Sequence, residues 1–153
     1  MKPRFRKSFH RNLDSKGRLM LPPEYRDIVS AASDSGGFML AIYDECIVAY
    51  PMPEWEAFTE QIEQGQHFDK NTRRFRSLVL GRAEELELDP QGRVRISQSL
   101  MRYAGLNKDV VLVGLGKKFE IWDAQRYEGL KLEDDALDLV VKGLAQSGIS
   151  FPQ

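Results

Sequence analysis

An aspartate, a glycine and an arginine occur twice in this sequence with the same spacing. The first copy is LDSKGR at residues 13–18 and the second is LDPQGR at residues 88–93, so the aspartates are 89 − 14 = 75 residues apart. An arginine presents a planar fork of donors that matches guanine O6 and N7 in the DNA major groove, or a phosphate. A neighbouring glycine allows close approach of the backbone, and Lys16 adds a point charge that suits phosphate. Such a pattern could contact nucleic acid.

Basic residues are concentrated at the start of the chain, although the formal net charge is only −1. Residues 1–18 contain a single acid, whereas residues 44–63 contain acids but no lysine or arginine. Because screening acts over a Debye length of about 8 Å, a local patch can bind an anion despite acids elsewhere. Charge alone equally allows a solvated, partly disordered tail. The basic residues of the patch are Lys2, Arg4, Arg6, Lys7, Arg11, Lys16 and Arg18.

No residue pattern predicts catalysis or metal binding. Acids cluster at Glu84, Glu85 and Glu87, but their alternation with leucine over 85–88 is typical of a strand with one solvated face. The two histidines are isolated from the single cysteine, Cys46, which adjoins apolar residues and is expected to be buried. The glycines in the segment 114–116 lack the third glycine of a nucleotide-binding loop. We therefore expect no enzymatic activity, no metal and no cofactor.

Each copy of the motif is expected to form a turn between two strands. Aspartate can accept hydrogen bonds from backbone N–H groups two or three residues further on, and glycine adopts a positive φ at little cost. Helix starts follow at Pro22-Pro23 and at Ser97, and glycines at 36–37 and 105 suit helix ends. Apolar runs at 38–42 and 47–50 recur at 110–114 and 119–122. Each unit therefore reads strand, turn, strand, short helix, strand, turn, strand.

The repeat divides the chain into four predicted parts. They are a first unit at 5–53, a helical connection at 54–81 with a break at 65–71, a second unit at 82–127, and a C-terminal helix and tail at 128–153. A unit of about 45 residues buries too little apolar surface to be stable alone. We therefore predict a mixed α+β, β-rich fold in which the two units interleave as a pseudo-twofold barrel. The last helix, expected over 133–145, should pack on its own or a neighbouring subunit through a stripe of Leu137, Val140, Val141 and Leu144.

Taken together, these segments resemble the MraZ family. The similarity rests on the duplicated LDxxGR motif and on the segments PMPEWE, RRFRSLVLGRAEELELD and GKKFEIWD, and it runs from about residue 5 to residue 127. It implies two fused units of the swapped-hairpin fold found in AbrB-like and MazE-like DNA-binding proteins. It also implies a homo-oligomeric ring of about eight subunits. The implied function is repression of the bacterial division and cell-wall gene cluster, including the regulator's own gene, through double-stranded DNA with direct repeats.

The resemblance places DNA contact on the LDxxGR turns. The implied DNA-binding residues are Lys16, Gly17 and Arg18, with Arg93 less secure, and the basic residues Arg4, Arg6, Lys7 and Arg11 are expected to add charge near the first turn. Asp14, Asp89 and Gly92 are expected to shape the turns without touching DNA. For Arg18 the alternative is a structural role, either as an exposed strand-end residue or as a partner of Asp14.

The two copies differ in charge. Lys16 is replaced by Gln91, and the basic segment before the first turn is replaced by AEELE at residues 83–87. We therefore expect the first unit to make most of the DNA contact, while the second completes the fold or contributes Arg93 at a flank. Any nucleic-acid site must depend on this local segregation of charge.

Two other functions are compatible with parts of the sequence. A MazE-like antitoxin would use a similar DNA-binding half and an acidic tail that wraps a toxin, but the second unit and the C-terminal apolar stripe argue against such a tail. A purely structural ring-forming protein would show no salt-sensitive DNA binding. No apolar run reaches the roughly 18–20 residues of a membrane span, so we expect a cytoplasmic, nucleoid-associated protein.

Overall fold

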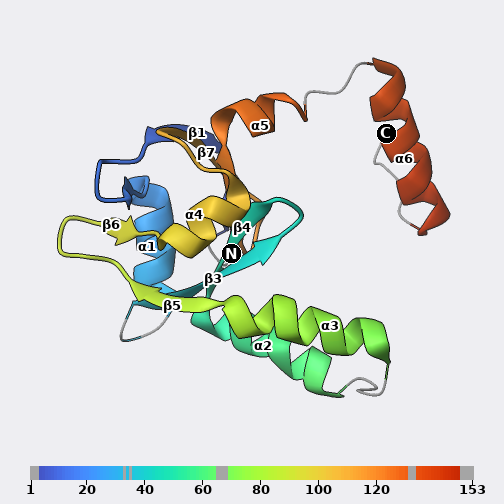
Figure 1. Cartoon of the computed structure of the whole chain (residues 1–153), viewed down its shortest axis with the longest axis horizontal. Helices are drawn as coiled ribbons and strands as arrows, with labels where there is room; N and C mark the ends of the chain where they lie inside the picture. Colours follow the sequence, from blue (N-terminus) through green and yellow to red (C-terminus); the bar gives the residue numbers. More distant parts are fainter. Residues whose placement is uncertain (1–3, 33, 35, 65–68, 131–133, 149–153) are drawn as a thin grey trace.

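The computed structural model describes residues 4–32, 34, 36–64, 69–130 and 134–148, and both predicted units have the expected order of elements (Figure 1). The first unit contains β1 (Ser8–Asn12), β2 (Arg18–Met20), α1 (Pro23–Ala32), β3 (Gly37–Tyr43) and β4 (Cys46–Pro51). The second unit contains β5 (Glu84–Glu87), β6 (Arg93–Arg95), α4 (Gln98–Ala104), β7 (Asp109–Gly114) and β8 (Phe119–Asp123). The connection contains α2 (Met52–Gln64), α3 (Lys70–Leu78) and the 3-10 helix η1 (Leu80–Arg82), and α5 (Ala124–Glu128) and α6 (Asp134–Gln146) follow the second unit.

The helix boundaries follow from local capping chemistry. Pro23 begins α1, where the missing N–H of proline costs nothing. Ser97 precedes α4, and its hydroxyl accepts a hydrogen bond from the backbone N–H of Leu100. Gly105 ends α4 in the left-handed conformation, with φ 61°. The first helix ends at Ala32, before the predicted end at Gly36.

Strands of the two units pair with each other rather than within their own unit. The six-stranded sheet has the order β1-β7-β8-β4-β3-β5, so the first strand of each unit pairs with a strand of the other. The short strands β2 and β6 form a separate antiparallel ribbon. Each LDxxGR turn thus joins two strands that belong to different sheets, which carries the chain from the edge of the large sheet into the ribbon.

The strand register is the same in the two halves. In the pairing of β1 with β7, His10 lies opposite Val111. Adding the repeat spacing to His10 (10 + 75 = 85) and subtracting the downstream spacing from Val111 (111 − 72 = 39) gives Glu85 and Met39, which lie opposite each other in the pairing of β5 with β3. The two units are therefore related by an approximate twofold axis through the centre of the sheet, as predicted.

One hydrophobic core is shared by both units. Buried side chains from α1, β3 and β4 pack with those of β6, α4, β7 and β8, so neither unit could enclose this core alone. The predicted barrel, however, is not closed, because within the described residues no ladder joins the edge strands β1 and β5. The physical reason is that both edges lead into the turns of the ribbon. Fully buried core residues include Tyr25, Phe38, Leu40, Ile47, Leu100, Leu112, Phe119 and Ile121.

The helical connection forms a hairpin beside the sheet, and α6 stands apart from the body (Figure 1). Aromatic side chains of Tyr50, Trp55, Phe58 and Phe75 pack between α2, α3 and β4. The predicted break at 65–71 falls largely on residues 65–68, which lie outside the described residues.

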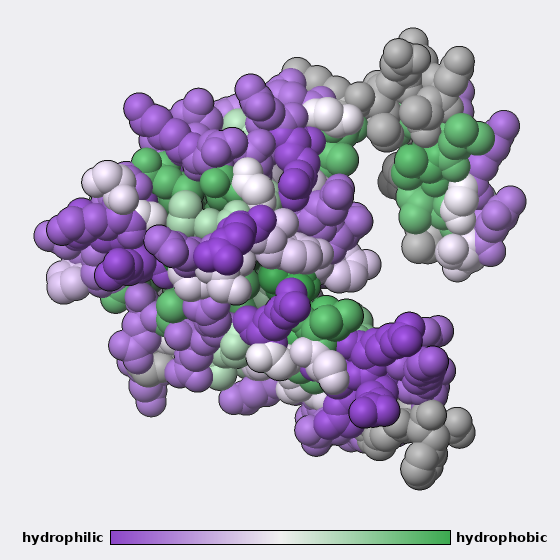
Figure 2. All heavy atoms as spheres, in the orientation of Figure 1, coloured by the Kyte–Doolittle hydropathy of each residue, from purple (hydrophilic) through white to green (hydrophobic). Residues whose placement is uncertain are grey.

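The C-terminal helix is helical over nearly the predicted range, but its apolar stripe does not pack into the core of its own chain. Leu137 is 53% exposed and Val140 is 48% exposed, and Val141 and Leu144 are half-buried. Figure 2 shows apolar surface on the side of α6 that faces the body of the molecule across an open gap. This face therefore remains accessible in the isolated chain.

Candidate nucleic-acid interface

Asp14 organises the first LDxxGR turn. Its Oδ1 atom accepts hydrogen bonds from the backbone N–H groups of Lys16 (2.9 Å) and Arg18 (2.8 Å). Its Oδ2 atom accepts a hydrogen bond from Nε of Arg18 at 2.6 Å. Gly17 adopts φ +76°, and its N–H donates to the backbone oxygen of Asp14 at 3.0 Å. The turn thus uses backbone donors two and four residues beyond the aspartate, and it orients the Arg18 side chain at the start of β2.

The second turn repeats this geometry with one addition. Asp89 accepts from the backbone N–H groups of Gln91 (2.9 Å) and Arg93 (2.8 Å), and from Nε of Arg93 at 2.8 Å. Gly92 adopts φ +81°. The Gln91 side-chain oxygen also accepts a hydrogen bond from Nη2 of Arg93 at 3.0 Å. Because Lys16 has no acceptor to offer at the equivalent position, no described residue other than Asp14 accepts from the Arg18 guanidinium.

Both aspartates are held in their ionised form. The backbone N–H of Arg18 is the main cause that lowers the pKa of Asp14 below its ordinary value of 3.8, and the Arg18 side chain lowers it further. The backbone N–H of Arg93 is likewise the main cause that lowers the pKa of Asp89. At neutral pH each turn therefore contains an anion that neutralises part of the charge on its own arginine.

The ribbon presents an arginine-rich face to solvent. In β2, Leu19 is fully buried while Arg18 and Met20 point outward, and in β6, Val94 is buried while Arg93 and Arg95 point outward. The register places Arg18 opposite Arg95 and Met20 opposite Arg93. A two-stranded β-ribbon of this kind is narrow enough to enter the major groove of DNA. The structure thus brings Arg18 and Arg93, predicted from the two turns, onto one surface.

The glycines of the turns are fixed by packing as well as by backbone conformation. A Cβ atom on Gly92 would collide with the side chain of Arg26, which comes from α1. On Gly17 it would lie 3.2 Å from the backbone oxygen of Ile96 and 3.3 Å from Sδ of Met101, which comes from α4. Each turn is therefore supported by the short helix of the opposite unit.

The basic segment before the first turn does not lie entirely beside it. Phe5 is buried and exchanges backbone hydrogen bonds with Gly116 at 2.8 and 2.9 Å, at the end of β7 remote from the turn. At about 3.3 Å per residue, Arg6 lies roughly 20 Å along the chain from the last residue of β1. Arg4 lines a hollow beside Lys117. Arg4 and Arg6 are thus at the opposite end of β1 from the turn near which they were expected.

The other two predicted basic residues have local partners. The ammonium group of Lys7 lies 3.7 Å from a carboxylate oxygen of Glu24, and both side chains are largely exposed. The Arg11 guanidinium lies over the Phe9 ring at 5.4 Å and donates to the backbone oxygen of His10. Arg11 is the member of this segment nearest to the turn in sequence.

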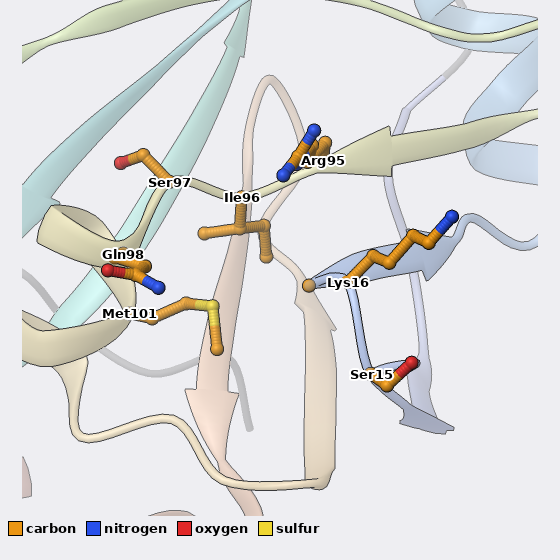
Figure 3. Close-up of a pocket in the computed structure, with 8 residues that line it drawn as sticks. Ser15, Lys16, Arg95, Ile96, Ser97, Gln98 and Met101 are labelled. Carbon is orange, nitrogen blue, oxygen red and sulfur yellow. The ribbon is translucent and has the colours of Figure 1, made fainter.

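The two ends of the ribbon differ in charge. A concavity of about 290 Å³ at the first end is lined by Lys16, Gly17, Arg95 and Met101, together with Ser15, Ile96, Ser97 and Gln98. Figure 3 shows the Lys16 and Arg95 side chains on one side of it and those of Gln98 and Met101 on the other. The hollow at the second end contains one arginine and two aspartates among its lining residues, which are Arg26, Asp27, Ser30, Gly36, Leu88, Asp89, Pro90 and Gly92. The first end is therefore the more positive.

Groups suited to other chemistry are sparse in the described residues. Within these residues, no group of three or more histidine, cysteine, aspartate or glutamate side chains could hold a metal ion. Cys46 is fully buried, and this burial is the main cause that raises the pKa of its thiol. In the part of the chain that the structure describes, no helix has the length and apolar character required to cross a membrane.

Comparison with known proteins agrees with the duplicated architecture. The sequence model of a protein family described as "MraZ protein, putative antitoxin-like" matches residues 5–78 and again residues 79–141. The chain belongs to the MraZ family. Its relatives include a "Transcriptional regulator MraZ" of Nitratidesulfovibrio vulgaris, which is 50% identical over 147 residues that cover 96% of this chain and 97% of that protein. Proteins with the same name in Oleidesulfovibrio alaskensis and Yersinia pestis are 44% and 42% identical, over 97% and 82% of this chain and 98% and 84% of their own lengths.

The resemblance to the MraZ family that the sequence indicated is thus confirmed, but sequence reasoning missed one residue of the ribbon. Arg95 lies directly opposite Arg18 and is exposed. The alternation of arginine with valine in RVR at 93–95 indicated that Arg93 and Arg95 share a face. Only the pairing of β2 with β6 shows that this face is shared with Arg18.

Proposed function

We propose that this chain is a sequence-specific, double-stranded DNA-binding transcriptional regulator without enzymatic activity. The observation that carries the proposal is the ribbon of β2 and β6, on which the two LDxxGR turns place Arg18 and Arg93 on one outward face. Its relatives are named transcriptional regulators, which supports the same role. The buried Leu19 and Val94 anchor the ribbon to the core, so the arginines are presented on a rigid support.

The proposed mechanism divides the contacts by their chemistry. Arg18 and Arg93 would offer their terminal guanidinium nitrogens to base edges in the major groove, because Nε of each is held by an aspartate in the turn. Lys16, exposed in the first turn, would bind a phosphate, and Gly17 would allow the backbone to approach DNA closely. Asp14 and Asp89 shape the turns, with Gly92, and are not expected to touch DNA. Arg4, Arg6, Lys7 and Arg11 would add sequence-independent attraction to phosphates.

The finer proposal is repression of the bacterial division and cell-wall gene cluster, including this regulator's own gene, by a ring of about eight copies on direct repeats. One good bidentate contact provides only about 1–3 kcal/mol of discrimination, which is too little to select a genomic site. Several subunits bound side by side would multiply such contacts through effective concentration. The exposed apolar stripe of α6 supports self-association, because an isolated chain leaves it in water. The proposed location is the cytoplasm, in association with the nucleoid.

The MazE-like antitoxin remains the second candidate because the family description includes the words "antitoxin-like" and because α6 is exposed. An antitoxin would be purified from its native host with a stoichiometric, unrelated small protein. A regulator that acts alone would be recovered as a complex of this chain only. A purely structural ring-forming protein would show no salt-sensitive DNA binding.

The test compares wild type, Arg18→Ala and Arg82→Ala on the chain's own upstream DNA and on scrambled DNA at two salt concentrations. Arg82 is an exposed arginine in η1 and serves as the matched control. We expect wild type and Arg82→Ala to prefer the upstream DNA, and Arg18→Ala to lose this preference while it keeps its oligomeric mass and circular dichroism spectrum. If wild type binds both DNAs equally, this promoter is not the operator. If it binds neither, the DNA-binding proposal fails.

A further inference from the structure

We propose that Arg95, in the second unit, binds the DNA backbone together with Lys16 of the first unit, so that the two units jointly build one phosphate site at the first end of the ribbon. The inference rests on the proposed DNA-binding function and adds a residue to it. Arg95 lies outside both LDxxGR motifs, and it reaches the first turn only because β6 pairs with β2. Lys16 and Arg95 line the same concavity, together with Gly17 (Figure 3).

The hydrogen-bond pattern of the ribbon brings Arg95 close to Arg18. The backbone N–H of Ile96 donates to the oxygen of Gly17 at 2.9 Å, and hydrogen-bonded and non-hydrogen-bonded pairs alternate along an antiparallel ladder. The next pair, Arg18 with Arg95, is therefore a non-hydrogen-bonded pair, in which Cα atoms are about 4.5 Å apart and side chains are closest. Two guanidinium groups thus leave the same small area of the surface in the same direction.

This arrangement is electrostatically unfavourable in the free protein. Like charges directly opposite each other on neighbouring strands destabilise the pair. Asp14 offsets part of the charge through Nε of Arg18, but Arg95 forms no ion pair with any of the described residues. Lys16 adds a third cation beside the same concavity. An anion placed over this end would offset the repulsion, and a DNA phosphate is the anion that the proposed function supplies.

The second end of the ribbon lacks the same cluster. The repeat spacing maps Arg95 onto Met20 (95 − 75 = 20) and Lys16 onto Gln91 (16 + 75 = 91). The second end therefore retains only the arginine of the motif, Arg93, whose guanidinium is bound by both Asp89 and Gln91. The cations that distinguish the two ends are those assigned here to phosphate, whereas the motif arginine is common to both.

The experiment measures DNA affinity of the full-length protein against salt by fluorescence anisotropy. The variants are Arg95→Gln, Arg95→Lys and the control Arg82→Gln, and the probes are the upstream duplex and a scrambled duplex. Loss of one phosphate contact per engaged subunit should weaken binding about eightfold at 0.1 M salt and about threefold at 0.3 M, on both duplexes. Arg95→Lys should restore most of the affinity because a phosphate accepts a point charge, and Arg82→Gln should bind as wild type does.

A stability measurement separates this role from a structural one. Because Arg95→Gln removes a like-charge pair, its urea midpoint should equal or exceed that of wild type while its DNA affinity falls. As a second variant, Met20→Arg with Gln91→Lys builds the same cluster at the other end and should steepen the salt dependence. The inference is overturned if wild type binds DNA and Arg95→Gln binds it with the same affinity and salt slope. It is also overturned if the loss is confined to the upstream duplex and Arg95→Lys does not restore it. If wild type itself shows no salt-dependent binding, the proposed function fails instead.

Discussion

Exchange of the residues at positions 16 and 91 tests whether the two turns contribute unequally to DNA binding. Lys16 and Gln91 occupy equivalent places in turns whose backbone hydrogen bonds match to within about a tenth of an ångström, at 2.9 and 2.8 Å in both. Lys16→Gln and Gln91→Lys therefore change the charge without a change in the turn. Gln91→Lys also removes the side-chain acceptor of Arg93.

The expected magnitude follows from counterion release. Each phosphate neutralised on duplex DNA contributes about 0.9 to the slope of log affinity against log salt. Between 50 and 200 mM salt, a fourfold change, one lost contact therefore alters the ratio of wild-type to variant affinity by a factor of about 3.5. We expect Lys16→Gln to lower the slope by about 0.9 per engaged subunit, and Gln91→Lys to raise it by less, because Asp27 and Asp89 lie at that end.

The assay is fluorescence anisotropy on the upstream duplex at five or more salt concentrations, with oligomeric mass checked at each, on the order of the range above. Lys70→Gln, which removes an exposed lysine at the start of α3, is the matched control and should leave the slope unchanged. If Lys16→Gln has the wild-type slope, or if Lys70→Gln lowers it equally, the assignment of Lys16 to a phosphate is refuted.

Three further predictions concern the turn, its carboxylate and α6. Gly17→Ala should lower the free energy of unfolding by about 1–2 kcal/mol, because alanine is strained at φ +76°, whereas Gly143→Ala in α6 should not; urea denaturation measures both. Because the folded-state pKa of Asp14 is lowered, its contribution to stability is complete above the unfolded value of 3.8 and is lost as the pH falls further, so the unfolding midpoints of wild type and Asp14→Asn should differ at neutral pH and converge in acid. Leu137→Gln with Val140→Gln should reduce the oligomeric mass seen by light scattering; an unchanged mass would show that α6 does not hold subunits together.

Much of the fold could be predicted because local signals and the repeat agreed. Ser97 and Gly105 bound a helix by standard capping, and Gly17 and Gly92 take the positive φ that their turns require. The duplication indicated interleaved units, because neither could bury a core alone. Closure of the sheet could not be read from the repeat, since it depends on where each edge strand leads after the turn. The position of α6 was equally inaccessible, because an apolar stripe such as that containing Leu137 does not specify its partner.

The candidate site was predictable to the extent that it is local in sequence. Asp14, Gly17 and Arg18 lie within one turn, so their spacing was sufficient to identify them. Arg95 was missed because its relation to Arg18 exists only across the ribbon, 77 residues away in sequence (95 − 18 = 77). The opposite error affected Arg4, which is close to the turn in sequence but lies at the far end of β1, since an extended chain separates residues by about 3.3 Å each.

The unequal ends of the ribbon bear on the kind of operator that this fold can read. A ribbon built from two identical chains has identical ends and matches a palindrome. Here the fold constrains the positions of Asp14, Gly17 and Arg18 and their counterparts, which form the turns, but positions 16 and 91, and 20 and 95, point to solvent and could diverge without cost to the core. Their divergence gives one subunit a direction along DNA. Under the proposed function, copies arranged head to tail in a ring would all bind in the same direction, and the matching DNA is a direct repeat rather than an inverted one.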